Sequence, residues 1–132
     1  MKMFRVIFTL ILLIGVLAYC TGQSMTPTEE KLTYEKLSKK LDKGEDFLLV
    51  DVRTPEEYSS GHIPGAINIP LSNIVDAFPT QDKNARVVVY CKSGNRSGQA
   101  QQALREKGYV NVTDFGGIPN WKGPLKTGND PK

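Results

Sequence analysis

The chain has 132 residues, of which 39% are hydrophobic and 23% are charged, and this suits one ordinary globular domain. The net charge is +3 and the basic residues form no run, so nucleic-acid binding is not indicated. One His and two Cys do not supply the ligand set of a zinc site, and we expect neither a metal nor a cofactor.

Residues 1–20 have the pattern of an export signal. Lys2 and Arg5 precede an almost unbroken apolar stretch from Val6 to Tyr19, which is shorter than the roughly 20 apolar residues of a typical spanning helix. We therefore expect export to the periplasm or cell envelope and favour a cleaved segment over a permanent anchor. The rest of the chain divides into a linker, a folded domain and a frayed tail: 21–30, 31–126 and 127–132.

Two interpretations of the end of this signal are open. Leu17 to Cys20 resembles the lipobox of bacterial lipoproteins, in which the Cys carries lipid, but Tyr19 stands where that pattern has a small residue. The alternative is simple cleavage after small residues at alternate positions, either Ala18 and Cys20 or Cys20 and Gly22. Lipid on Cys20 would anchor the protein to a membrane. With either ending, Cys91 is the only free thiol in the folded domain.

The folded part alternates between strand and helix patterns. Residues 31–32 are a candidate edge strand, and buried strands are predicted from apolar runs at 47–52, 66–69, 86–90 and 111–115. Helices are predicted between Thr33 and Gly44, over 54–60, after Ser72 and over 97–107. The clearest helix start is Thr54-Pro55-Glu56-Glu57, a capping box with Pro at the first helical position. This alternation predicts an α/β domain with a parallel sheet and helices on both faces.

The chemistry is expected at Cys91, where the strongest strand pattern ends. Ligands of open α/β sheets bind at the carboxyl ends of strands, and the N–H groups of a small loop before a helix favour anions. Lys92 and Arg96 add positive charge. These features favour the nucleophilic thiolate over a structural role for Cys91. The residues that we expect to bind substrate follow it directly: Lys92, Ser93, Gly94, Asn95, Arg96 and Ser97.

Four stretches resemble the rhodanese superfamily, in the family's order. They are Asp51–Tyr58, Gly61–Pro70, Cys91–Ser97, and Gly116-Gly117 with Trp121. Together they span nearly the whole folded part, and the exported single-domain layout is most similar to the periplasmic phage-shock type of this family. The resemblance implies a five-stranded parallel sheet with helices on both faces and a sulfurtransferase activity.

In the family, the thiolate at the Cys91 position attacks the outer sulfur of thiosulfate, releases sulfite and carries a persulfide held by the loop's N–H groups. The resemblance implies that the sulfur then passes to cyanide or to a thiol acceptor. The alternative is a persulfide carrier or binding protein for one specific partner, without turnover. Phosphatase activity, found on the same fold, is disfavoured because four residues separate Cys91 from Arg96 and those enzymes need five.

The other polar residues near the expected site have structural alternatives. Asp51 and Arg53 end a predicted strand, and we expect them to support the loop rather than to contact substrate. His62 is expected to make structural hydrogen bonds. Arg96 has two equal interpretations, pairing with a carboxylate or binding the anion. Trp121 is expected to pack against the core near the end of the fold.

Overall fold

The structure, a computed structural model, describes residues 30–129. The expected signal over 1–20, with Cys20, and the end of the expected tail lie outside the described residues. Among the helices of the described range, none is long and apolar enough to cross a membrane.

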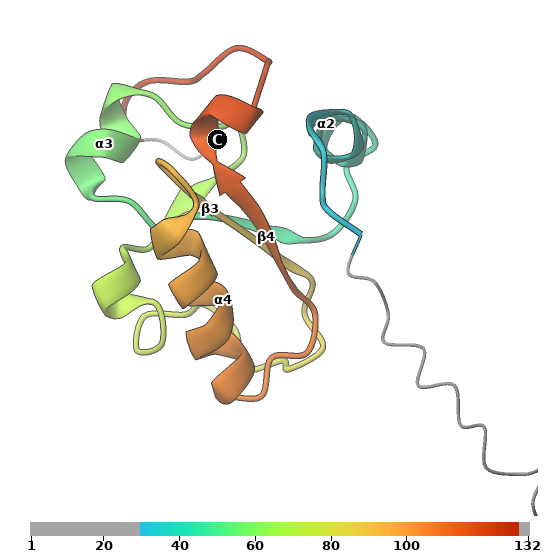
Figure 1. Ribbon diagram of the computed structural model, residues 1–132, viewed down its shortest axis with the longest axis vertical. Helices are drawn as coiled ribbons and strands as arrows, with labels where there is room; N and C mark the ends of the chain where they lie inside the picture. The colour runs from blue at the N-terminus through green and yellow to red at the C-terminus, as the bar shows by residue number, and fades with distance from the viewer. Residues whose placement is uncertain (1–29, 130–132) are drawn as a thin grey trace, which may run out of the picture. The chain divides into compact units, whose positions relative to one another are not determined.

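A four-stranded parallel sheet forms the centre of the domain (Figure 1). Its spatial order is β2-β1-β3-β4, and each neighbouring pair is parallel, so the carboxyl ends of all strands lie at one edge. The central strand β3 is buried at every residue, as its apolar sequence predicts. The strands are β1 (Leu48–Asp51), β2 (Ile67–Asn68), β3 (Val87–Cys91) and β4 (Val112–Gly117).

The two faces of the sheet bury two separate apolar clusters. Along β3, Val89 and Cys91 belong to one cluster and Val88 and Tyr90 to the other. The first face is covered by α4 (Asn95–Glu106) and the 3₁₀ helix η1 (Leu71–Asn73), and the second by α2 (Tyr34–Asp42) and α3 (Pro55–Ser60). The strands are continuous apolar runs because both faces of the sheet are buried. The predicted α/β architecture is confirmed.

The expected number of strands is wrong, because the described residues form a sheet of four and not five strands. Lys31 and Leu32, the candidate edge strand, pair with no strand. The Thr33 side chain accepts a hydrogen bond from the Lys36 N–H and starts α2 immediately afterwards. Leu32 instead packs with Leu37 in the second cluster.

The helix expected after Ser72 is also different. The chain forms only the 3₁₀ turn η1 there, and the Ser72 hydroxyl donates to the Asn73 side chain instead of capping an α-helix. Ile74 and Phe78 are nevertheless buried in the first cluster. Their spacing therefore indicated burial correctly and an α-helix wrongly.

The capping box at the start of α3 is confirmed. The Glu57 N–H donates to the Thr54 hydroxyl at 3.2 Å, and the Thr54 N–H donates to the Glu57 carboxylate at 3.0 Å. Pro55 is the first residue of the helix. Because α3 starts soon after β1 ends, the capping carboxylate lies near the carboxyl edge of the sheet.

Candidate active site

Cys91 is the last residue of β3, and it is fully buried. The chain then turns through Lys92, Ser93 and Gly94 into α4, which begins two residues earlier than predicted, at Asn95. Gly94 has φ +101°, in the left-handed region that glycine adopts readily. This turn brings the N-terminus of α4 next to the cysteine sulfur.

Two polar groups from this turn lie within hydrogen-bond distance of the sulfur, and the thiol donates to the Ser97 hydroxyl while it is protonated. The Gly94 N–H donates to Cys91 Sγ at 3.0 Å, and the Ser97 hydroxyl oxygen lies 3.4 Å from the same atom. The Ser97 hydroxyl also lies within hydrogen-bond distance of the Gly94 carbonyl, at 3.1 Å, and of the Gly116 carbonyl, at 3.4 Å. A hydroxyl has only one hydrogen to donate, and the protonated thiol does not need it. When the thiol ionises, the Ser97 hydroxyl can rotate and donate this hydrogen to the sulfur.

Burial acts to raise the pKa of the Cys91 thiol, because a buried thiolate loses its hydration. The Ser97 hydroxyl and the backbone N–H groups of Ser97, Gly94 and Ser93 act in the opposite direction by hydrogen bonding to the sulfur. They outweigh burial, and the pKa of Cys91 lies below the ordinary value of a thiol. The thiolate, which is the nucleophile, is therefore favoured at this position.

The end of β4 packs against the loop. A Cβ at Gly117 would lie 2.7 Å from the Lys92 carbonyl oxygen, which no ordinary side chain tolerates. The register of β3 and β4 shifts just before this point, and the Asp114 carboxylate accepts the Gly116 N–H at 2.7 Å. Gly116 and Gly117 end β4 and let the strand approach the loop closely.

The residues that were expected to bind substrate lie around Cys91, and they differ in how far they are exposed to solvent. Lys92, Ser93 and Asn95 are exposed, whereas Ser97 is buried against the sulfur. Asn95 accepts a hydrogen bond from the Gln99 side chain one turn along α4.

Arg96 pairs with a carboxylate, one of its two predicted interpretations. Its two terminal nitrogens donate to the Glu57 carboxylate at 2.7 and 2.9 Å. Hydrogen bonding from Arg96 lowers the pKa of Glu57 to about 2, so Glu57 and Arg96 are both ionised at neutral pH. The sequence singled out Glu57 only as part of a capping box, and no local signal there connects it to a loop 39 residues away.

Asp51 and Arg53 form a buried ion pair, with Arg53 Nη2 at 2.6 Å from Asp51 Oδ2. Arg53 also donates to the Gly61 carbonyl at 2.7 Å, and its guanidinium lies 5.8 Å from the centre of the Tyr90 ring. Burial, together with the Asp51 charge, raises the pKa of the Tyr90 hydroxyl. The pair thus joins the ends of β1 and β3 to the segment at Gly61, and its support of the loop stays a prediction.

His62 and Trp121 occupy structural positions. His62 is fully buried, its Nδ1 lies 2.9 Å from the Tyr58 carbonyl oxygen, and its ring stacks on Tyr58 at 3.8 Å. Trp121 is half-buried against the second cluster and meets Tyr34 edge-on at 5.1 Å. Within residues 30–129, no group of three or more His, Cys, Asp or Glu side chains could hold a metal ion.

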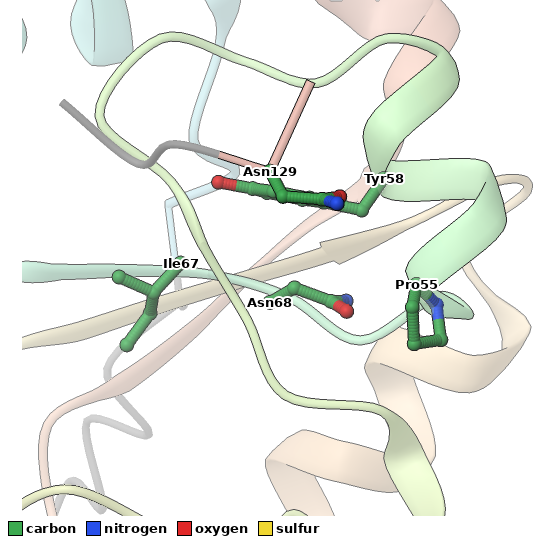
Figure 2. A pocket seen from close by; sticks show the side chains of 5 residues that line it. All are labelled: Pro55, Tyr58, Ile67, Asn68 and Asn129. Carbon is green, nitrogen blue, oxygen red and sulfur yellow. The ribbon is translucent and has the colours of Figure 1, made fainter. Parts of the chain in front are cut away.

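A separate pocket lies beside α3 (Figure 2). Its Asn68 amide donates to the carbonyl groups of Asp51 and Arg53 and is thereby fixed. None of the lining residues belongs to the Cys91 loop, so the sulfur chemistry does not take place in this pocket. The lining residues are Pro55, Tyr58, Ile67, Asn68 and Asn129.

A buried cysteine with a lowered pKa, at the carboxyl end of a central parallel strand and beside a helix N-terminus, defines an enzyme with a cysteine nucleophile. A family model described as a rhodanese-like domain matches residues 33–124. The chain therefore belongs to the rhodanese-like domain family.

Two relatives and one solved structure agree with this assignment. Thiosulfate sulfurtransferase PspE of Escherichia coli (strain K12) is 48% identical over 71 residues, which are 52% of this chain and 68% of that protein. Thiosulfate:glutathione sulfurtransferase of Saccharomyces cerevisiae is 38% identical over 88 residues, which are 57% of this chain and 63% of that protein. A solved rhodanese with anions from E. coli has a TM-score of 0.58 and 43% identity, and the match covers 61% of this chain and 98% of that one. The chain is accordingly a sulfurtransferase.

Proposed function

We propose that this sulfurtransferase takes sulfane sulfur from thiosulfate onto Cys91 and passes it to a thiol or to cyanide. The observation that carries the proposal is the position of Cys91 Sγ, 3.0 Å from the Gly94 nitrogen and 3.4 Å from the Ser97 hydroxyl. These donors lower the pKa of the thiol, and the same donors suit a persulfide anion that extends from the sulfur.

The first half-reaction is attack of the Cys91 thiolate on the outer sulfur of thiosulfate. A bond forms between the two sulfurs, the S–S bond of thiosulfate breaks, and its electron pair leaves with sulfite. Sulfite is a weak base, and exchange at sulfur is faster when the leaving group is a weaker base. Cys91 is left as a persulfide anion, so no oxidant or reductant is consumed.

In the second half-reaction an acceptor attacks the outer sulfur of the persulfide. Cyanide becomes thiocyanate, or a thiolate becomes a new persulfide, and the electron pair of the broken bond returns to Cys91 as a thiolate. Donor and acceptor thus react in separate steps, which gives ping-pong kinetics. The name of the yeast relative, a thiosulfate:glutathione sulfurtransferase, supports a thiol acceptor.

The loop residues have distinct roles in this proposal. Lys92 is exposed at the start of the loop and attracts the anionic donor. The N–H groups of Ser93 and Gly94 stabilise the negative charge that develops on the outer sulfur. Ser97 stabilises the thiolate form of Cys91, and Arg96 acts through its pair with Glu57.

The location of the protein is a further part of the proposal. Lys2, Arg5 and the apolar stretch Val6 to Tyr19 support export to the periplasm or cell envelope, with residues 31–126 as the catalytic domain. Fractionation of cells that express the wild type and Cys20→Ala separates the two endings of the signal. Membrane association that is lost in the variant indicates a lipoprotein, and soluble behaviour of both proteins indicates cleavage.

The proposed function is tested by steady-state assays with thiosulfate and cyanide, and with thiosulfate and a thiol. The wild type is expected to turn over, with parallel double-reciprocal lines for a ping-pong reaction. Loading of one sulfur atom without turnover of either acceptor would instead identify a persulfide carrier that serves one partner.

A further inference from the structure

Glu57 is an acidic side chain that contacts the cysteine loop. Three donors converge on its carboxylate, namely the Thr54 N–H at 3.0 Å and the two terminal nitrogens of Arg96 at 2.7 and 2.9 Å. The capping bond fixes Glu57 on α3, and the two bonds to Arg96 form the planar two-point contact that guanidinium and carboxylate groups prefer. Glu57 therefore joins the start of α3 to the first turn of α4, where the cysteine loop ends.

This pair changes the charge that a sulfur donor meets at the loop. The positive charge of Arg96 is offset by Glu57 at direct contact, so the pair presents almost no net charge to a ligand beyond it. Lys92 is exposed and forms no ion pair with any residue of the described range 30–129. The loop thus offers one uncompensated cation and its backbone N–H groups, although its sequence contains two cations.

We infer that Glu57 sets the charge preference of the site for its sulfur donor, by keeping Arg96 in an ion pair of zero net charge at the edge of the cysteine loop. The inference rests on the proposed function of Cys91 and assigns a specificity role to a residue outside the loop. Removal of the Glu57 charge leaves Arg96 as a full cation and favours dianionic donors. Removal of the Arg96 charge leaves Glu57 as a lone anion and disfavours them.

Two donors with the same reacting bond separate this effect from other changes. Thiosulfate carries two negative charges and methanethiosulfonate carries one, and each presents a terminal sulfur bonded to an oxidised sulfur. The Cys91 thiolate attacks the terminal sulfur in both cases, and the electron pair leaves with sulfite or with methanesulfinate. At a separation of about 10 Å and a solvent-like effective dielectric constant, one unit of charge changes the preference between these donors by about twofold.

The test compares Glu57→Gln with Glu56→Gln. Gln at position 57 can still accept the Thr54 N–H, so the cap of α3 is retained. Glu56 is exposed on the same turn and makes no ion pair with the described residues, so its variant has the same change of net charge without release of Arg96. The measured quantity is kcat/KM for thiosulfate divided by kcat/KM for methanethiosulfonate, at low ionic strength and again in high salt.

We expect this ratio to rise about twofold in Glu57→Gln, to change much less in Glu56→Gln, and to return towards the wild-type value in high salt, which screens exposed charges. In Arg96→Gln the ratio should fall below that of the wild type. The opposite directions matter because a purely structural disturbance of the loop would lower activity in both variants without moving the ratio in opposite senses.

A ratio that is equal in Glu57→Gln and Glu56→Gln, or that moves in the same direction in Glu57→Gln and Arg96→Gln, would overturn the inference. If Glu57→Gln does not fold, the direction of the ratio in Arg96→Gln decides, and an unchanged or increased ratio there counts against it. A wild-type protein that takes sulfur from neither donor would contradict the proposed function instead, so the two failures can be told apart.

Discussion

Ser97→Ala removes the hydroxyl that lies 3.4 Å from the Cys91 sulfur and leaves the backbone donors of the loop in place. A hydrogen bond to a charged acceptor contributes about 1.5–3 kcal/mol, and we take the lower end here because sulfur is a weak acceptor. About 1.4 kcal/mol is a factor of ten in an equilibrium constant. The pKa of Cys91 should therefore rise, and the thiolate fraction at pH values below that pKa should fall roughly tenfold.

The assay is the rate of alkylation by iodoacetamide as a function of pH. The rate follows the thiolate, so it falls as the pH drops through the pKa of Cys91, and the Ser97→Ala curve should be displaced to higher pH. Each curve is normalised to its own plateau, because the intrinsic nucleophilicity of a thiolate changes with its pKa. Ser93→Ala is the matched control, since its hydroxyl is exposed and only its N–H acts on the sulfur. Curves of Ser97→Ala and wild type that coincide would refute the assigned role of the hydroxyl.

Three other changes act on different parts of the site. Gly117→Ala puts a Cβ 2.7 Å from the Lys92 carbonyl oxygen, so the loop must shift and kcat/KM should fall roughly tenfold or more; an unchanged value contradicts the close approach. Asp51→Asn leaves the buried Arg53 cation without its carboxylate partner and should cost about 3–5 kcal/mol in the free energy of unfolding, measured with denaturant; a loss below about 1 kcal/mol would contradict the importance of this ion pair. Lys92→Ala should raise the KM for thiosulfate more than it lowers kcat, and the reverse pattern would place Lys92 at the leaving sulfite.

The parts of the fold that the sequence predicts well are those with strong local signals. The three consecutive valines of β3 predict a strand buried on both faces, and Thr54 with Glu57 predicts the start of α3, because each pattern lies within a few residues. The segment after Ser72 was mispredicted because apolar spacing records which side chains are buried, and a 3₁₀ turn with irregular backbone buries Ile74 and Phe78 as well as a helix would.

In the candidate site, too, the residues with a local sequence signal could be predicted and those brought together by packing could not. Cys91 and its loop are contiguous in the chain, so their chemistry is visible from residue order alone. The partner of Arg96 is 39 residues distant, and only the packing of α3 against the first turn of α4 brings Glu57 to it. The same holds for Gly117, whose need to lack a side chain arises from the Lys92 carbonyl on the neighbouring strand end.

The central claim is that Cys91 carries the sulfur, and intact-protein mass spectrometry after incubation with thiosulfate tests it most directly. The wild type should gain the mass of one sulfur atom, located on Cys91 by peptide mapping and removed by cyanide. Cys91→Ser should keep its fold by circular dichroism, gain no sulfur and show no turnover. A wild type that gains no sulfur, or a Cys91→Ser variant that still turns over thiosulfate, would contradict the account.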